Sequence, residues 1–166
     1  MSSGKIPLYS GSRVPRDRLG FNSIPESPMI PNRSVPQCTV IPQLAYPDVR
    51  RATAWLCDAF GFRVRLFIGD HRVQLHIGDG AMVVTEQKTP GSQRSSGASV
   101  MVRVGDVDEH HERARRHGAV ILRPPQDYPY GERQYSAEDV NGYVWTFTES
   151  IADVKPEDWG GESVEL

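Results

Sequence analysis

The sequence predicts an α+β fold in which two consecutive βαβββ modules form one domain. The first observation is a repeated order of features. A strand, an aspartate, an amphipathic helix and a glycine follow one another over residues 39–61, and again over 98–118. The second observation is that three short strand-like segments, separated by turn residues, follow each helix. Because the repeat occurs only twice, it does not predict a solenoid, which needs more units to bury a core.

The chain has the composition of a soluble globular protein, since 38% of its 166 residues are hydrophobic and 24% are charged. A formal net charge of -2 argues against nucleic acid or a membrane surface as a partner. No apolar run approaches the roughly 20 residues that span a bilayer. No apolar signal core follows the N-terminus, so we expect a cytoplasmic protein. Cys38 and Cys57 form no Cys-x-x-Cys motif, which favours reduced thiols over a zinc site or a disulfide.

The sequence divides into an arm, a domain and a tail. Eight of the 13 prolines lie within the first 47 residues, and residues 1–37 show no apolar periodicity, so they predict an irregular N-terminal arm. Residues 38–150 form the predicted domain, with one module over about 38–88 and the other over about 98–150. A stretch rich in Gly, Ser and Pro separates the modules, and 151–166 form a C-terminal tail.

The first module begins with a strand over 39–46, which ends at Pro47. Asp48 is the N-cap of a helix that continues to about Phe60, because apolar residues then recur at helical spacing. Gly61 ends this helix as a C-cap. Three strands are expected over 62–68, 71–77 and 81–86, with glycine-containing turns between them.

The second module repeats this order. A strand over 98–104 precedes Asp106, which with Glu109 makes a capping box for a second helix that ends at Gly118. A short strand is expected over 120–122, and Pro124-Pro125 predicts the beginning of a loop. Two further strands, over 134–137 and 143–148, complete the pattern.

Paired βαβββ modules resemble the vicinal-oxygen-chelate superfamily, which includes glyoxalases, bleomycin-resistance proteins and dioxygenases. Four segments carry the likeness, and the first of them is similar to the first strand of PhnB-like members. The segments are residues 41–48 (IPQLAYPD), 59–62 (AFGF), 105–119 (GDVDEHHERARRHGA), and 129–133 with 139–147 (PYGER, DVNGYVWTF). The resemblance covers residues 38–150. It implies one glyoxalase/bleomycin-resistance-type domain whose open sheet encloses a cleft for a small ligand.

The resemblance also implies where metal ligands would lie, because metal-dependent members use histidines and glutamates on inward strand positions. Aligned on the repeated aspartates, Ile41 and Ser99 occupy the two histidine positions, and Thr146 occupies the last glutamate position. These side chains are not competent ligands for a transition metal at neutral pH. Glu86, near the fourth position, could not hold a metal alone. We therefore predict no metal site of the family's usual kind, and no cofactor.

Alternation along the strands predicts which side chains line the cleft. The candidate ligand-binding residues are Gln43, His76, Met101, Arg103, Tyr130 and Thr146. Arg103 is a candidate partner for a carboxylate or phosphate, since guanidinium binds both bidentately, although it could equally pair with an internal acid. Tyr130 lies in a loop, 127–133, that could cover the mouth of a pocket or simply cross a sheet edge. His76 could hydrogen-bond a ligand or be an ordinary solvated strand residue.

Three functions are compatible with this pattern. The first is a metal-independent protein that binds a small organic compound, of the toxic or antibiotic-like kind suggested by bleomycin-resistance members. The second is an enzyme, a lyase, isomerase or dioxygenase, which would need a metal or an acid–base pair such as His76 with Glu86 or Glu132. The third is an interaction module in which the arm and tail embrace a second subunit. The resemblance implies a homodimer.

Overall fold

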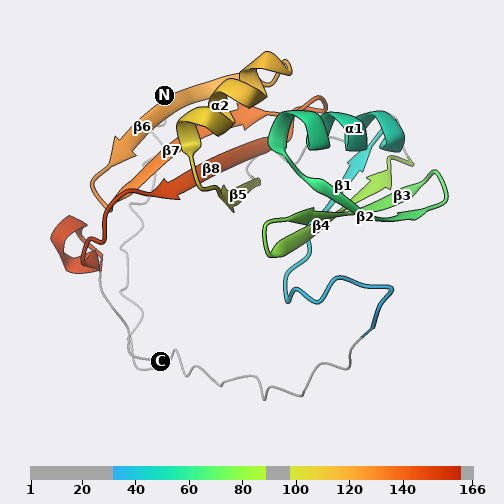
Figure 1. Cartoon of the computed structure of the whole chain (residues 1–166), viewed down its shortest axis with the longest axis horizontal. Helices are drawn as coiled ribbons and strands as arrows, with labels where there is room; N and C mark the ends of the chain where they lie inside the picture. The colour runs from blue at the N-terminus through green and yellow to red at the C-terminus, as the bar shows by residue number, and fades with distance from the viewer. Residues whose placement is uncertain (1–31, 89–97, 162–166) are drawn as a thin grey trace, which may run out of the picture. The chain divides into compact units, whose positions relative to one another are not determined.

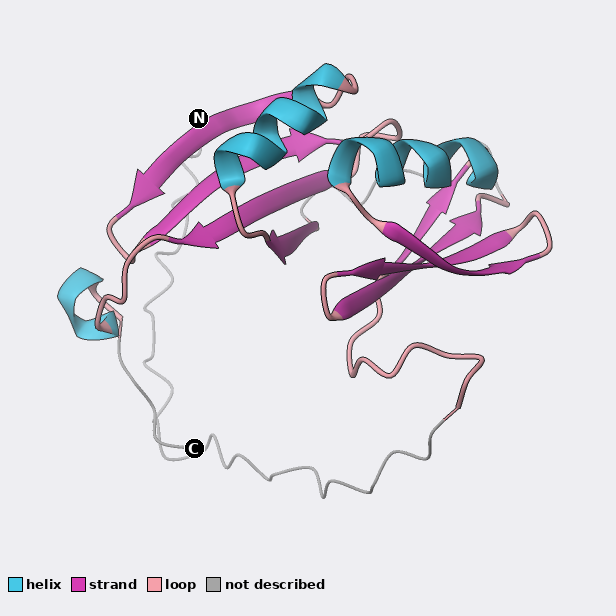
Figure 2. Ribbon diagram, viewed as in Figure 1, coloured by secondary structure: helices cyan, strands magenta, loops and turns pink. Residues whose placement is uncertain are grey.

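The computed structural model describes residues 32–88 and 98–161 of the chain (Figure 1). Two separate four-stranded sheets each have one helix packed on one face (Figure 2). The α+β class and the two-module order are therefore confirmed, and the two sheets do not join into one closed sheet. Most of the predicted arm and the last five residues of the tail lie outside the described residues.

The first module contains β1 (Gln43–Tyr46), α1 (Val49–Phe60), β2 (Arg63–Ile68), β3 (Arg72–Ile77) and β4 (Gly80–Glu86). Its strands lie in the order β1-β4-β3-β2, with β1 parallel to β4 and the other pairs antiparallel. The Asp48 side chain accepts a hydrogen bond from the Arg51 amide at 2.9 Å, and Gly61 adopts φ 73°, so both predicted caps are present.

The second module contains β5 (Ser99–Arg103), α2 (Val107–Arg116), β6 (Val120–Tyr128), β7 (Glu132–Glu138) and β8 (Val144–Ser150). Its strand order, β5-β8-β7-β6, repeats that of the first sheet. Asp106 caps α2 by accepting from the Glu109 amide at 2.8 Å. A 3₁₀ turn, η2 (Pro156–Trp159), follows the second module.

The structure corrects the prediction that a loop begins at Pro124. Strand β6 continues through both prolines to Tyr128, with breaks in its register on either side of Arg123. Proline cannot donate to a neighbouring strand, but β6 is the edge of its sheet, where missing donors and bulges are tolerated. The predicted loop over 127–133 contains the ends of β6 and β7 and the tight turn between them, in which the Gly131 amide donates to the Tyr128 carbonyl at 3.0 Å.

The core lies between each sheet and its helix. Alternate strand residues, among them Val73, Leu75, Trp145 and Phe147, are fully buried on the face that the helix covers. Aromatic rings from both modules meet here, with the Phe60 ring centroid 4.8 Å from that of Phe147. No helix packs on the opposite face of each sheet, which we call the helix-free face.

The two helices join the modules by capping each other. Arg113 of α2 donates to the carbonyls of Asp58 (2.8 Å) and Cys57 (3.1 Å) at the C-terminal end of α1. In return, Trp55 Nε1 of α1 donates to the His117 carbonyl at the end of α2, at 2.7 Å. Because the last carbonyls of a helix lack intrahelical partners, these contacts stabilise both helix ends and the joint between the modules.

A buried carboxylate forms a second joint. Asp139, in the turn between β7 and β8, accepts from the Tyr46 hydroxyl at 2.6 Å and from Trp145 Nε1 at 3.0 Å. Its other oxygen accepts from the amides of Asn141 and Tyr143. The carboxylate and burial together raise the pKa of the Tyr46 phenol, with burial as the larger cause. The turn that carries the Asn-Gly pair thus fixes β1 of the first module to the second.

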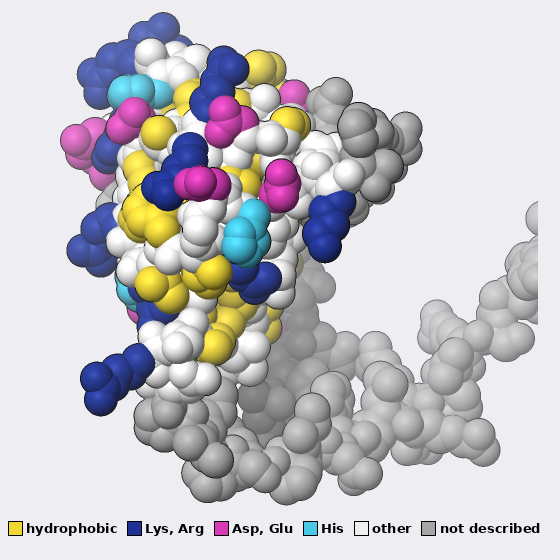
Figure 3. All heavy atoms as spheres, turned by 90° about the vertical axis from the view of Figure 1, so that its right-hand side faces the viewer, with side chains coloured by type: hydrophobic (Ala, Val, Ile, Leu, Met, Phe, Trp, Pro, Cys, Tyr) yellow, Lys and Arg dark blue, Asp and Glu magenta, His cyan; other side chains and the backbone are white. Residues whose placement is uncertain are grey.

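The surface shows no dominant charge on the face seen in Figure 3, where Lys and Arg, Asp and Glu, and hydrophobic side chains are interspersed. Among the described residues, no helix is long and apolar enough to cross a membrane.

Candidate ligand-binding faces

The helix-free face of the second sheet carries three of the six predicted site residues, Met101, Arg103 and Thr146, and Tyr130 lies at its edge. Met101 of β5 lies opposite Thr146 of β8, which in turn lies opposite Ser136 of β7. The Thr146 and Ser136 hydroxyls are 3.1 Å apart and hydrogen-bonded, whereas the Met101 residue is 62% exposed. The exposed Met101 thioether offers a ligand an apolar contact, and the half-buried Thr146 hydroxyl beside it offers a hydrogen bond, whereas Ser136 is buried.

A row of polar side chains continues along the same face. The Gln134 amide donates to the Thr148 hydroxyl at 3.1 Å, and Thr148 donates to Glu132. Ser150 donates to the other oxygen of Glu132 at 2.5 Å. These hydroxyl donors, first that of Ser150, lower the pKa of the Glu132 carboxyl, so that Glu132 is an anion and hydrogen-bond acceptor at neutral pH.

Arg103 lies at the end of β5 beside this row. Its guanidinium is 3.9 Å from the Glu132 carboxylate, and its side chain remains 74% exposed. This is a long, solvated ion pair, which contributes little to stability. Arg103 therefore has an internal acid as a partner, which is one of the two predicted alternatives. Its remaining N–H donors are accessible to an anionic group of a ligand.

Tyr130 lies in the β6–β7 turn rather than in a lid. Its hydroxyl donates to the Gln134 side chain at 3.2 Å, and its ring stacks on Tyr128 at 5.2 Å between centroids. The Trp159 ring of η2 also packs against Tyr130, with ring centroids 5.4 Å apart. Trp159 is not among the predicted ligand-binding residues, because no local pattern in the tail predicts that it folds back to this turn.

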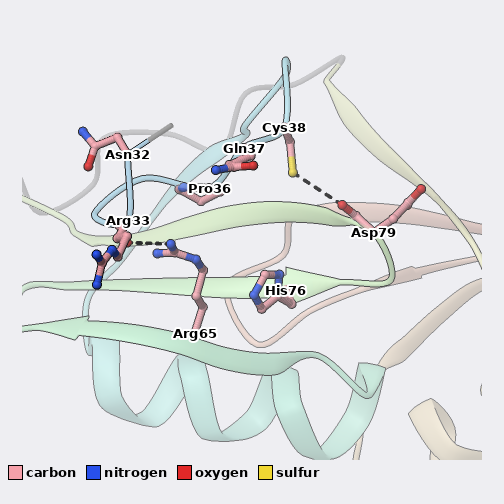
Figure 4. A pocket seen from close by; sticks show the side chains of 8 residues that line it. All are labelled: Asn32, Arg33, Pro36, Gln37, Cys38, Arg65, His76 and Asp79. Carbon is pink, nitrogen blue, oxygen red and sulfur yellow. Dashed lines mark hydrogen bonds between the residues drawn. The ribbon is translucent and has the colours of Figure 1, made fainter. Parts of the chain in front are cut away.

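The other two predicted site residues, Gln43 and His76, lie on the first sheet. Residues 32–38, which we call the strap, run across the helix-free face of this sheet (Figure 4). Between the strap and the strands is a hollow of about 480 Å³. It is lined by Asn32, Arg33, Pro36, Gln37 and Cys38 of the strap and by Arg65, His76 and Asp79 of the sheet module.

Sequence reasoning missed two residues of the first sheet that hold the strap, Arg65 and Gln74. Gln74 alternates with buried apolar residues in β3, which places it on the helix-free face with His76, yet it is only 4% exposed and donates to the strap. Arg65 lies where the register of β2 shifts. A buried glutamine needs polar partners, but only the folded strap shows which groups supply them.

The predicted residues therefore form two groups on two sheets. Gln43 and His76 belong to the first group, and Met101, Arg103 and Thr146 to the second, with Tyr130 at its edge. Side-chain orientations along β1, β5 and β8 match the predicted alternation, since Leu44, Val102 and Trp145 pack into the core.

The described residues do not fit the metal ion of metal-dependent family members. Across 32–88 and 98–161, no group of three or more His, Cys, Asp and Glu side chains is positioned to hold a cation. Ser99 and Thr146, at two of the predicted positions, offer hydroxyls only, and Ile41 offers no donor.

The acid–base pairs considered for an enzyme are not assembled. His76 pairs with Ala81 of β4, five residues before Glu86. Glu132 lies on the second sheet, where it accepts two hydroxyl hydrogen bonds. His110 is in α2 and packs into the core, as its ring contacts with Phe147 and Phe60 show. Burial lowers the pKa of His110, so it is a neutral structural residue.

Comparisons with known proteins agree with this fold. The model of the Glyoxalase/Bleomycin resistance protein/Dioxygenase superfamily matches residues 36–147. No curated protein matches the chain. Among solved structures, TioX from Micromonospora sp. ML1 is 36% identical; the match covers 71% of this chain and 100% of TioX, with a TM-score of 0.58.

Two more distant structures share the fold alone. A glyoxalase/bleomycin resistance protein/dioxygenase family enzyme from Burkholderia phytofirmans PsJN is 17% identical, with 66% of this chain and 95% of that chain covered and a TM-score of 0.57. The fosfomycin resistance protein FosX from Listeria monocytogenes is 16% identical, with 68% and 92% covered and a TM-score of 0.56. From its two βαβββ modules and these matches, the chain belongs to the glyoxalase/bleomycin resistance protein/dioxygenase superfamily.

Proposed function

We propose that this protein binds a small organic compound on the helix-free faces of its sheets without using a metal ion. The observation that carries the proposal is the make-up of the second face. Met101 is exposed beside the Thr146–Ser136 hydroxyl pair, and the accessible Arg103 lies at the end of the same strand. An apolar contact, neutral hydrogen-bonding groups and one cation suit an organic molecule that carries an acidic group.

Two comparisons support a role in resistance to a toxic compound. The family includes bleomycin resistance proteins, and the structural relative FosX is a fosfomycin resistance protein. These names describe the relatives, and a shared fold does not fix a shared ligand. We propose that the ligand of this chain is a toxic or antibiotic-like compound, and that the chain belongs to the PhnB-like subgroup and acts in the cytoplasm.

A thermal-shift screen of planar aromatic acids and peptide-like compounds against the full chain tests the proposal. We expect a subset to raise the melting temperature, because a ligand that binds only the folded state stabilises it by mass action. The hits are then titrated into Met101→Asp and Arg103→Ala, and each substitution is expected to weaken binding about tenfold or more.

Arg116→Ala is the matched control, since Arg116 is an exposed arginine on α2, away from both helix-free faces. Its affinity for the hits should equal that of the unaltered chain. A screen without a single stabilising compound, or hits whose affinity is unchanged by both face substitutions, would contradict the proposed site.

The alternative, a lyase, isomerase or dioxygenase acting on a small organic substrate, predicts turnover of the hits. Liquid chromatography of each hit after incubation with the chain distinguishes the two functions. Under the binding proposal the compound is recovered unchanged, whereas product formation that His76→Gln abolishes would establish the enzyme.

We also propose that the chain forms a homodimer. Light scattering on the full chain should give about twice the 18.5 kDa mass of one chain. If the arm embraces the partner, a chain without residues 1–36 should have the mass of a monomer. A shortened chain that is still a dimer would show that the arm does not hold the interface.

A further inference from the structure

We propose that the strap occupies a binding site on the helix-free face of the first sheet, and that a ligand must displace the strap to bind there. The proposal deepens the proposed function, because it adds a competitor to one of the two candidate faces. Three observations carry it: how the strap is held, what it covers, and how the second sheet differs.

The sheet holds the strap by its backbone carbonyls. Arg65 Nη2 donates to the Arg33 carbonyl at 2.7 Å and to the Val35 carbonyl at 3.4 Å. Gln74 Nε2 donates to the Ser34 carbonyl between them, at 2.9 Å. Arg65 Nη1 also donates to the Gln74 side-chain carbonyl, which fixes the two donors relative to each other.

These hydrogen bonds are made to backbone carbonyl groups of the strap and not to its side chains. Three successive backbone oxygens receive hydrogen bonds from two sheet residues, as they would in peptide recognition. Any molecule that presents neutral amide carbonyls a few ångströms apart meets the same donors. The ligand class that the face fits is therefore a peptide-like compound.

The strap covers groups that would otherwise be accessible. Gln74, which donates to the Ser34 carbonyl, and Pro36 of the strap are both buried, and Pro36 and His76 line the hollow of about 480 Å³ (Figure 4). The strap has no helix or strand of its own, so few local hydrogen bonds are lost when it leaves.

The repeated modules supply an internal comparison. Gln74 pairs with Val83 on β4 as Ser136 pairs with Thr146 on β8, so Gln74 and Ser136 hold corresponding places. Arg123 of β6 donates to Ser136 at 3.4 Å, as Arg65 of β2 donates to Gln74. Both faces thus carry an arginine joined to a central polar residue, and the strap lies over the first of them.

Limited trypsin digestion of the full chain tests whether the strap is docked, because trypsin cuts after Arg33 only when this bond leaves the sheet. We expect the Arg33–Ser34 bond to be cut about tenfold faster in Arg65→Gln and in Pro36→Gly, since each variant weakens the docked strap. Arg63→Gln, which alters an exposed arginine of the same strand, should be cut as slowly as the unaltered chain. Thermal melts show that each variant is folded.

A peptide probe then tests the competition. The probe is the acetylated and amidated pentapeptide of residues 32–36 with Ser in place of Arg33, and its binding is followed by saturation-transfer NMR. Pro36→Gly frees the face and keeps its donors, so it should bind the probe. Arg65→Gln frees the face but lacks the donors, so it should not. The unaltered chain should bind the probe weakly, because its own strap is present at high effective concentration.

The strap is not held as described if trypsin cuts the unaltered chain rapidly, or if Arg65→Gln and Pro36→Gly are cut no faster than the unaltered chain. Equal probe binding by Pro36→Gly and Arg65→Gln would remove the donors from recognition, and no binding by Pro36→Gly would end the competition. The digestion needs no ligand and the ligand screen uses Met101 and Arg103 on the other sheet. The two experiments therefore distinguish a failure of the strap proposal from a failure of the proposed function.

Discussion

His110 shows how a residue that looks like a ligand in the sequence becomes part of the core. Its Nε2 faces the Phe60 carbonyl at 3.0 Å, so this nitrogen carries the proton. Its Nδ1 then accepts from the Tyr135 hydroxyl, at 2.6 Å. The histidine thus joins the end of α1 to β7 in its neutral form.

The lowered pKa of His110 makes stability depend on pH. Because burial disfavours the imidazolium, the unfolded chain binds this proton more readily, and the stabilisation is complete above the ordinary histidine pKa of about 6.5. It is lost as the pH falls through the lowered pKa of the folded state. We expect urea unfolding to give a smaller free energy at pH 5.5 than at pH 7.5.

His110→Gln should reduce this pH dependence and cost about 1–2 kcal/mol at pH 7.5, because Tyr135 loses its acceptor. His71→Gln is the control, since His71 is exposed in a turn. If His110→Gln and the unaltered chain lose the same free energy between the two pH values, the buried neutral histidine is not the cause.

At the scale of elements, the β6–β7 hairpin depends on one glycine. Gly131 has φ +79°, and a Cβ placed on it would lie 2.3 Å from the Ala152 carbonyl oxygen. The Gly131 carbonyl accepts from the amides of Ile151 and Ala152, which joins the hairpin to the segment after β8. A side chain here would separate this segment and with it the Tyr130–Trp159 contact.

Gly131→Ala should therefore destabilise the protein by about 2–4 kcal/mol, from backbone strain together with the clash. Gly118→Ala provides a matched comparison, because Gly118 has φ +82° but open space around it, so strain alone costs about 1 kcal/mol. Urea unfolding of the two variants measures the difference. Equal losses would mean that the hairpin does not pack on residues 151–152.

Local signals in the sequence predict the elements well and their contacts poorly. Both aspartate caps, both helices and most strands follow from spacing and turn residues, as Asp48, Asp106 and Gly61 show. The extension of β6 through Pro124 and Pro125 could not be predicted, because whether proline is tolerated depends on which strand lies at the edge.

The candidate site shows the same limit. Alternation predicts that Met101 and Thr146 share a face, and the structure places them opposite each other. The strap over Gln74 and the return of Trp159 to Tyr130 are contacts between distant segments, and no local pattern encodes them. Whether the six predicted residues bind a ligand remains a prediction.

At the scale of the whole molecule, the two modules share one topology but differ in what lies on their helix-free faces. Reciprocal caps from Arg113 and Trp55, and the buried Asp139, join two modules of one topology. The helix-free face of one module carries the strap, and that of the other carries Met101 and a row of hydroxyls. Within residues 32–88 and 98–161, neither face brings together three histidines, cysteines or carboxylates that could hold a metal ion.

The metal content of the full chain tests this central claim most directly. The chain is purified without chelator, incubated with zinc, nickel, manganese or ferrous ions, freed of unbound ions and analysed by mass spectrometry of the elements. We predict far less than one ion per chain in every case, because the described part of the chain places no three ligands around one point. About one tightly bound ion per chain, lost when His76 or Glu86 is replaced by alanine, would contradict the account.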